Sequence, residues 1–148
     1  MEEYCVTDSP LGPLKITATD RGISGIAFCA DPVRETEHPL LKETEKQLRE
    51  YFAGRRKVFD LPLDLQGTEF QKLVWQALRD IPYGATRSYG EIARVIGRPK
   101  AARAVGMANH VNPIVIVVPC HRVIGADGRL TGYGGGLGKK EYLLKHER

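Results

Sequence analysis

A chain of 148 residues is long enough for one domain with a well-filled core or for two small domains packed together. Its hydrophobic content of 42% and charged content of 27% are those of an ordinary globular protein, which argues against extensive disorder. No run approaches the roughly 18 apolar residues that a membrane span needs, and Met1-Glu2-Glu3 lacks the basic start of a signal peptide. We therefore expect a cytoplasmic protein with no membrane segment.

Charge is distributed unevenly along the chain. Residues 1–66 carry 9 Lys and Arg against 12 Asp and Glu, whereas residues 67–148 carry 13 against 6. The first part is therefore acidic and the second is basic, so we expect an anionic partner for the second part.

The N-terminal part begins with a pattern typical of an antiparallel meander. Between residues 4 and 30, two groups of turn-forming residues, at 8–13 and 20–22, separate three short strand-like segments. An amphipathic helix from His38 to Phe52, ended by Gly54, should cover this meander.

The cysteines do not form a recognisable disulfide or metal pattern. There are three, and none belongs to a Cys-x-x-Cys pair, which fits a reducing compartment. Cys5 and Cys29 would lie on the outer strands of the meander as core residues, as a disulfide, or as metal ligands with His38. Two cysteines and one histidine leave a tetrahedral zinc one ligand short, so we favour core residues and assign no metal.

Residues 58–65 predict an edge strand or an extended linker, because they alternate weakly and contain Pro62. A domain boundary is expected near residues 64–67, which gives domains 1–65 and 66–148. After it the pattern changes from strands to helices.

Two capping boxes mark the next helices. Thr68-x-x-Gln71 should open a helix that runs to about Asp80, with Phe70, Val74, Ala77 and Leu78 facing inward. Ser88-x-x-Glu91 should open a second helix that ends at Gly97.

A third short helix is expected from about Pro99 to His110, and with the preceding helix it would form a helix-turn-helix or a plain helical hairpin. The surrounding basic residues favour a DNA-binding motif; they are Arg87, Arg94, Arg98, Lys100 and Arg103.

The residues that suggest chemistry follow an apolar run. Residues 114–118 are almost wholly β-branched and predict a buried strand, which Pro119 ends. Cys120, His121 and Arg122 come next, and a second strand near residues 122–124 would complete a wing. An isolated cysteine is most often a buried core residue, but the adjacent imidazole and guanidinium favour a reactive thiol.

The chain closes with a glycine-rich segment, residues 128–138, that we expect to form a flexible pocket wall. A last helix, residues 139–147, would carry Tyr142, Leu143 and Leu144 inward and would bring Glu147 to the end of the chain.

Several motifs together resemble the O6-alkylguanine-DNA alkyltransferases, nearly continuously from Phe70 to Glu147. They are Pro119-Cys120-His121-Arg122-Val123, Ser88-Tyr89, Ala101-Ala102-Arg103-Ala104-Val105-Gly106, Asn112-Pro113 and Tyr133-x-Gly-Gly-Leu137. The N-terminal half is similar to the family only in length and strand-rich pattern. The resemblance implies an α+β fold, with an N-terminal ribonuclease-H-like α/β roll packed on a C-terminal winged-helix-like domain.

The resemblance also implies DNA repair by stoichiometric transfer of an alkyl group from guanine O6 to Cys120. The partner would be double-stranded DNA that contains O6-alkylguanine, with O4-alkylthymine as a second candidate substrate. We expect a monomer that uses no cofactor.

Catalytic roles are implied for four residues. His121, acting through a water, would take the Cys120 proton, and Glu147 would orient the imidazole. We expect a bridging water because adjacent residues on an extended chain point in opposite directions. Tyr89 would donate to the guanine ring nitrogen.

A substrate pocket and a DNA surface are implied as well. Asn112 would brace the cysteine loop, and Val123, Tyr133 and Gly134 would close the pocket. Some relatives carry a polar residue at the position of Gly134, so we expect a roomier pocket that accepts bulky adducts.

On the DNA surface, the damaged base must be flipped out of the duplex, because sulfur cannot reach its O6 substituent within the stack. Arg103 would enter the stack and Ala102 would lie close to the minor groove, while Arg98 and Gly90 would meet phosphates.

Three other classes of protein remain as alternatives. A non-enzymatic alkyltransferase-like DNA binder lacks the cysteine that is present here. A winged-helix regulator with a redox cysteine would bind one operator sequence, and a cysteine hydrolase normally takes its Cys and His from separate segments.

Overall fold

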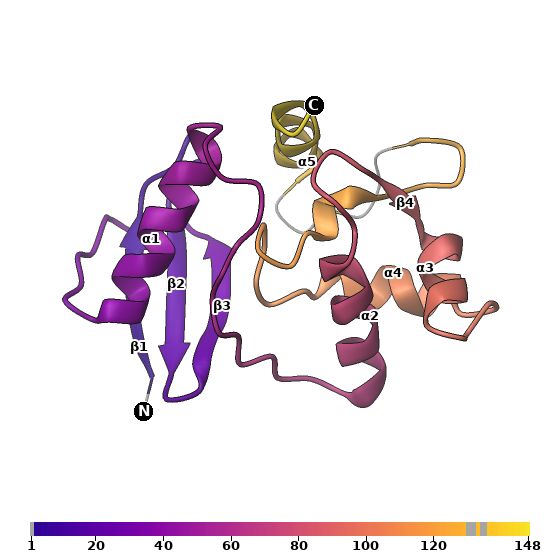
Figure 1. Ribbon diagram of the computed structural model, residues 1–148, viewed down its shortest axis with the longest axis horizontal. Coiled ribbons are helices and arrows are strands. Elements are labelled where there is room, and N and C mark those ends of the chain that lie inside the picture. Colours follow the sequence, from indigo (N-terminus) through magenta and orange to yellow (C-terminus); the bar gives the residue numbers. More distant parts are fainter. Residues whose placement is uncertain (1, 130–132, 134–135) are drawn as a thin grey trace. The chain divides into compact units, whose positions relative to one another are not determined.

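The computed structural model describes residues 2–129, 133 and 136–148, and its chain divides into two compact units, Met1–Gln66 and Gly67–Arg148 (Figure 1). The first unit contains an antiparallel sheet in the order β1-β2-β3. Its strands are β1 (Glu3–Thr7), β2 (Leu14–Thr19) and β3 (Gly22–Phe28), which confirms the predicted meander.

Helix α1 (Pro39–Phe52) packs on one face of this sheet, as the sequence predicts (Figure 1). It begins after His38, whose Nδ1 accepts hydrogen bonds from the backbone N–H groups of Leu40 and Leu41. Alternate β2 residues, namely Leu14, Ile16 and Ala18, are buried, as are Leu41, Leu48 and Tyr51 of the helix. The core thus forms where every second residue of the strand packs against the apolar face that a period of 3.6 gives the helix.

The segment after α1 is extended and only touches the edge of the sheet. Leu63 forms an isolated parallel bridge with Ile23, whose N–H donates to the Pro62 carbonyl over 2.9 Å. Gly22 is required here, because its φ is +150° and a Cβ would lie 2.6 Å from the Pro62 oxygen.

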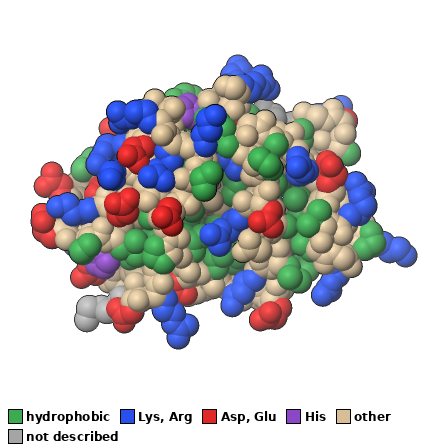
Figure 2. Space-filling model, viewed as in Figure 1, with side chains coloured by type: hydrophobic (Ala, Val, Ile, Leu, Met, Phe, Trp, Pro, Cys, Tyr) green, Lys and Arg blue, Asp and Glu red, His purple; other side chains and the backbone are tan. Residues whose placement is uncertain are grey.

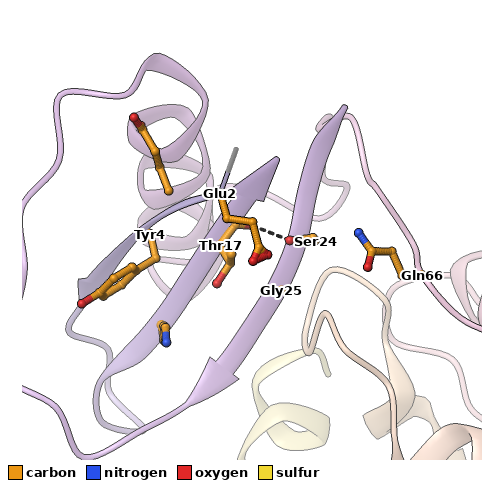
Figure 3. A pocket seen from close by; sticks show the side chains of 8 residues that line it. Glu2, Tyr4, Thr17, Ser24, Gly25 and Gln66 are labelled. Atoms are coloured by element: carbon orange, nitrogen blue, oxygen red, sulfur yellow. Dashed lines mark hydrogen bonds between the residues drawn. The ribbon is translucent and has the colours of Figure 1, made fainter. Parts of the chain in front are cut away.

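The opposite face of the sheet carries an open, polar hollow (Figure 3). Ser24 donates to the Thr17 carbonyl, and the Lys15 ammonium lies 4.6 Å from the centre of the Tyr4 ring. No cysteine or histidine is among the described residues that line it. Cys5 is fully buried in the core of this unit, and Cys5 and Cys29 are both free thiols.

The second unit contains helices α2 (Glu69–Arg79), α3 (Tyr89–Val95), α4 (Ala102–His110) and α5 (Leu137–His146). Both predicted capping boxes are present, at Thr68 and at Ser88. The third helix begins later than expected: residues 98–101 form a turn, and no side chain caps α4. Pro99 therefore lies in the turn and does not begin the helix.

The apolar run at residues 114–118 is not a strand, which corrects the sequence prediction. Residues 115–117 form tight turns, in which the N–H of Val118 donates to the Ile114 carbonyl over 3.0 Å. Ile116 has a φ of +73°, which is unusual for a β-branched residue. The alternating burial of Ile114, Ile116 and Val118 shows that these side chains fill the core from a turn, so β-branched composition did not determine a strand here.

Some predicted inward positions are also wrong. Trp75 is buried and its indole Nε1 donates to the Ala108 carbonyl over 2.9 Å, whereas Phe70 is only half-buried. In α5 only Leu143 of the three expected residues is buried, and Tyr142 is exposed. In the described part of the chain, no helix has both the length and the apolar character to cross a membrane.

Candidate active site

Cys120 begins a short 3₁₀ helix, η1 (Cys120–Arg122), and is buried with 3% of its surface exposed. The backbone is therefore not extended at this point, so the prediction that Cys120 and His121 point in opposite directions along a strand is wrong. Pro119 precedes the turn, and its carbonyl accepts from the Arg122 N–H over 2.9 Å.

The turn is connected to the helix-turn-helix by a short sheet. Strand β5 (Val123–Ile124) pairs in parallel with β4 (Arg87–Ser88), and not with residues 114–118 as a wing would require. Because α3 starts directly after β4, this pairing places the start of that helix, with Tyr89, next to the chain that leaves the cysteine turn. A Cβ at Gly106 would lie 3.8 Å from the Tyr89 ring, which is ordinary van der Waals contact, so α4 lies close to this ring.

His121, Arg122 and Glu147 form a buried ionic cluster. The Glu147 carboxylate lies 2.8 Å from His121 Nε2 and accepts two hydrogen bonds from Arg122, at 2.8 Å from Nε and 3.0 Å from Nη2. The Arg122 Nη1 donates to the Ile81 carbonyl over 2.7 Å, and the guanidinium lies 5.8 Å from the Tyr83 ring centre. Tyr83 donates in turn to the His146 carbonyl, so the end of α5 is held to this cluster.

Burial has the largest effect on the protonation of His121. Complete burial lowers the pKa of its imidazole, although the Glu147 carboxylate opposes this shift. The neutral ring then donates from Nε2 to the carboxylate, which leaves Nδ1 as an acceptor. Nδ1 is buried and has no hydrogen-bond partner among the described residues.

The Cys120 thiol lies in an environment that mostly opposes ionisation. Burial raises its pKa to about 11, while a hydrogen bond from Asn112 and the charge of Lys140 favour the thiolate. Asn112 is itself held in place, since its Nδ2 donates to the Val118 carbonyl over 2.8 Å and its Oδ1 accepts from the Ile114 N–H over 3.0 Å. The thiol is therefore protonated at neutral pH and needs a base.

Lys140 is a member of the site that the sequence reasoning missed. It is fully buried, its ammonium donates to the Val123 carbonyl, and burial lowers its pKa to about 8. Helical spacing could have found it, because Lys140 and Leu143 of α5 and its C-cap residue Glu147 follow one another at i, i+3 and i+7.

Asn109 was missed as well. It lies on the buried face of α4, where its Nδ2 donates to the Cys120 carbonyl over 3.3 Å. A polar residue among the apolar positions Val105 and Ala108 was the available signal.

The expected pocket residues are partly brought together with the cysteine. Val123 and Tyr133 are buried, and the pKa of Tyr133 is raised by burial and, to a smaller extent, by the Cys120 charge. Gly134, which we expected to widen the pocket, lies outside the described residues.

The expected DNA-contacting residues lie on the surface of the helix-turn-helix. Arg98 and Arg103 are exposed, and Gly90 and Ala102 are half-buried. Over the first unit acidic and basic side chains are interspersed (Figure 2), in contrast to the basic excess of the second unit.

Comparisons with known proteins cover both units. Residues 3–65 match the 6-O-methylguanine DNA methyltransferase ribonuclease-like domain, and residues 69–148 match the DNA-binding domain of the same family. Methylated-DNA–protein-cysteine methyltransferases from Methanosarcina acetivorans and Mycolicibacterium paratuberculosis are 52% and 54% identical. These alignments cover 97% and 100% of this chain, and 97% and 93% of the relatives.

Solved structures agree with these matches. The Mycobacterium tuberculosis OGT in complex with DNA is 52% identical, with a TM-score of 0.88 over 96% of this chain and 90% of its own. The enzyme from Pyrococcus kodakaraensis is 26% identical, with a TM-score of 0.61 over 99% of both chains. The α+β fold, with a ribonuclease-like first domain and a DNA-binding second domain, is as expected. The chain belongs to the methylated-DNA–protein-cysteine methyltransferase family, whose members are DNA-repair enzymes.

Proposed function

We propose that this protein binds alkylated duplex DNA and transfers the alkyl group from guanine O6 to the Cys120 sulfur, once per molecule. The observation that carries the proposal is a buried thiol in the same turn as a neutral histidine, whose free Nδ1 can accept a proton. A relative of high identity has been solved in complex with DNA, which supports the choice of substrate.

The reaction requires a thiolate, because the thiolate and not the thiol attacks carbon. Burial keeps Cys120 protonated in the free protein, so the proton moves to His121 Nδ1 through a water as the reaction proceeds. The imidazolium that forms is stabilised by the Glu147 carboxylate, 2.8 Å from Nε2. Lys140 contributes a second positive charge close to the sulfur.

In the transfer step one bond forms, one bond breaks, and the Cys120 proton ends on the products. The sulfur electron pair forms the S–C bond while the C–O6 bond breaks, and that second pair passes to the guanine ring. Tyr89 donates its hydroxyl proton to the ring nitrogen as negative charge develops on the base. The proton released by Cys120 finally replaces the proton that Tyr89 supplied. The products are guanine and a thioether. Thiolate is a poor leaving group from saturated carbon, and the described residues supply no route that releases the alkyl group from this thioether, so we expect one turnover.

DNA binding is assigned to the helix-turn-helix. The exposed Arg103 of α4 would fill the space left by the flipped base, and the small Ala102 would allow close approach to the minor groove. Arg98 and Gly90 would contact phosphates, which supply salt-dependent affinity. Val123 and Tyr133 would line the base pocket, with Asn112 bracing the cysteine turn. The same pocket would admit O4-alkylthymine as a second substrate.

The test is a stoichiometric titration with duplex DNA that contains labelled O6-methylguanine. Protein-bound label should rise to one methyl group per chain and then remain constant when more DNA is added. Label that continues to be consumed by the same molecules would contradict a single turnover, and no label on protein would contradict the transfer itself.

A further inference from the structure

Helix α4 has an exposed face and a buried face with different contacts. Arg103 and Met107 are exposed, whereas Val105, Ala108 and Asn109 are buried. Asn109 is only 2% exposed, and it is the polar member of the buried face. The same helix that we assign to DNA therefore reaches the cysteine turn through this residue.

The orientation of the Asn109 amide follows from its contact. Its partner is the Cys120 carbonyl, which can only accept a hydrogen bond, so the group 3.3 Å away is the NH₂. The Oδ1 atom therefore points elsewhere. It is buried and has no hydrogen-bond partner among the described residues.

A second unsatisfied acceptor belongs to the side chain of the next residue, His121. The carbonyl that Asn109 holds belongs to the peptide bond between Cys120 and His121, and His121 Nδ1 is another buried side-chain atom without a hydrogen-bond partner among the described residues. Since Nε2 donates to Glu147, Nδ1 is an acceptor. Buried acceptors of this kind are normally satisfied, and an ordered water is the usual donor where protein offers none.

A single water matches the needs of these groups. It can donate one hydrogen to Asn109 Oδ1 and the other to His121 Nδ1, and it can accept from the Cys120 S–H. Those three hydrogen bonds are the number typical of a buried water. A water held at Oδ1 through one hydrogen would keep its second hydrogen for Nδ1.

We propose that Asn109 is a positioning residue that orients the water through which the Cys120 proton reaches His121. The inference rests on the proposed function and adds a residue to it. The thiol proton passes to the water oxygen as a water proton passes to Nδ1, so the water is regenerated. The sulfur keeps its electron pair, and Asn109 neither gains nor loses a proton.

The test measures the reactivity of Cys120 without DNA, as the pH dependence of its alkylation by iodoacetamide, read by peptide mass. Asn109→Leu keeps a similar volume and removes both polar contacts. We expect alkylation at neutral pH to slow roughly tenfold, as loss of one hydrogen bond predicts, and the profile to shift to higher pH. Val105→Ala, on the same buried face, is the matched control. It should lower stability without shifting the profile.

A double-mutant cycle separates positioning from packing. If Asn109 acts through His121, Asn109→Leu should add little to the effect of His121→Gln. An unchanged profile in Asn109→Leu, or full additivity with His121→Gln, would overturn the proposal.

Two further measurements keep the proposal testable. If Asn109→Leu does not fold, a high-resolution crystal structure of the wild type decides, since a water should lie within hydrogen-bonding distance of both Oδ1 and Nδ1. A crystal structure with no water between Asn109 Oδ1 and His121 Nδ1 would overturn the inference. Failure of the proposed function would be seen separately, as a wild-type protein that takes no methyl group from DNA.

Discussion

Replacing Glu147 by Gln tests the buried ionic cluster. The carboxylate accepts two hydrogen bonds from Arg122 and pairs with His121, and each of the three residues is at most 6% exposed. An amide offers one oxygen and turns N–H groups toward donors, so the Arg122 cation loses its compensating charge. Removal of one partner from a buried pair typically costs about 3–5 kcal/mol, a large part of the roughly 5–15 kcal/mol that stabilises a domain.

Urea unfolding monitored by Trp75 fluorescence measures this cost, because this buried residue is the only tryptophan in the chain. With an m-value of roughly 1–3 kcal/mol per molar urea, the midpoint should fall by on the order of 2 M. Glu141→Gln, in the helix that Glu147 caps, is the matched control, since the Glu141 pair with Lys145 is exposed. It should leave the midpoint nearly unchanged. A wild-type midpoint for Glu147→Gln would refute the reasoning.

The remaining predictions concern charge, DNA contacts and backbone strain. Burial lowers the pKa of Lys140 from 10.5 to about 8, so the unfolded chain binds more protons between these values. Wild type should therefore gain stability relative to Lys140→Met as pH rises from 8 toward 10.5, and parallel curves of unfolding free energy would argue against this. Arg98→Ala should weaken DNA binding for all sequences and reduce the salt slope by about one, whereas an unchanged slope would exclude a phosphate contact. Gly22→Ala should destabilise the first unit by about 1–3 kcal/mol through backbone strain and the clash with Pro62. Gly12→Ala, which has a φ of +101° but open space around it, should cost less; equal melting temperatures would rule out the clash.

Local rules predicted much of the fold. The meander, α1 and both capped helices follow from turn residues, hydrophobic period and capping boxes, each of which acts within a few residues. The rules failed at residues 114–118, where β-branched composition favoured a strand. Tertiary packing instead favours a turn, from which these side chains fill the core.

The site was predictable only where motif and chemistry coincide. Cys120, His121 and Glu147 were identified, and the structure places His121 and Glu147 in contact. Arg122, Lys140 and Asn109 were missed as partners because their roles depend on burial. From sequence alone, a lysine or asparagine is predicted to lie on the surface, and only the structure shows that it is buried.

The central claim is that Cys120 is the alkyl acceptor. Intact-mass analysis after incubation with O6-methylguanine duplex DNA tests it most directly. Wild type should gain the mass of one methylene, fragment spectra should place it on Cys120, and Cys120→Ser should gain nothing. An unchanged wild-type mass, or a methyl group on Cys5 or Cys29, would contradict the account.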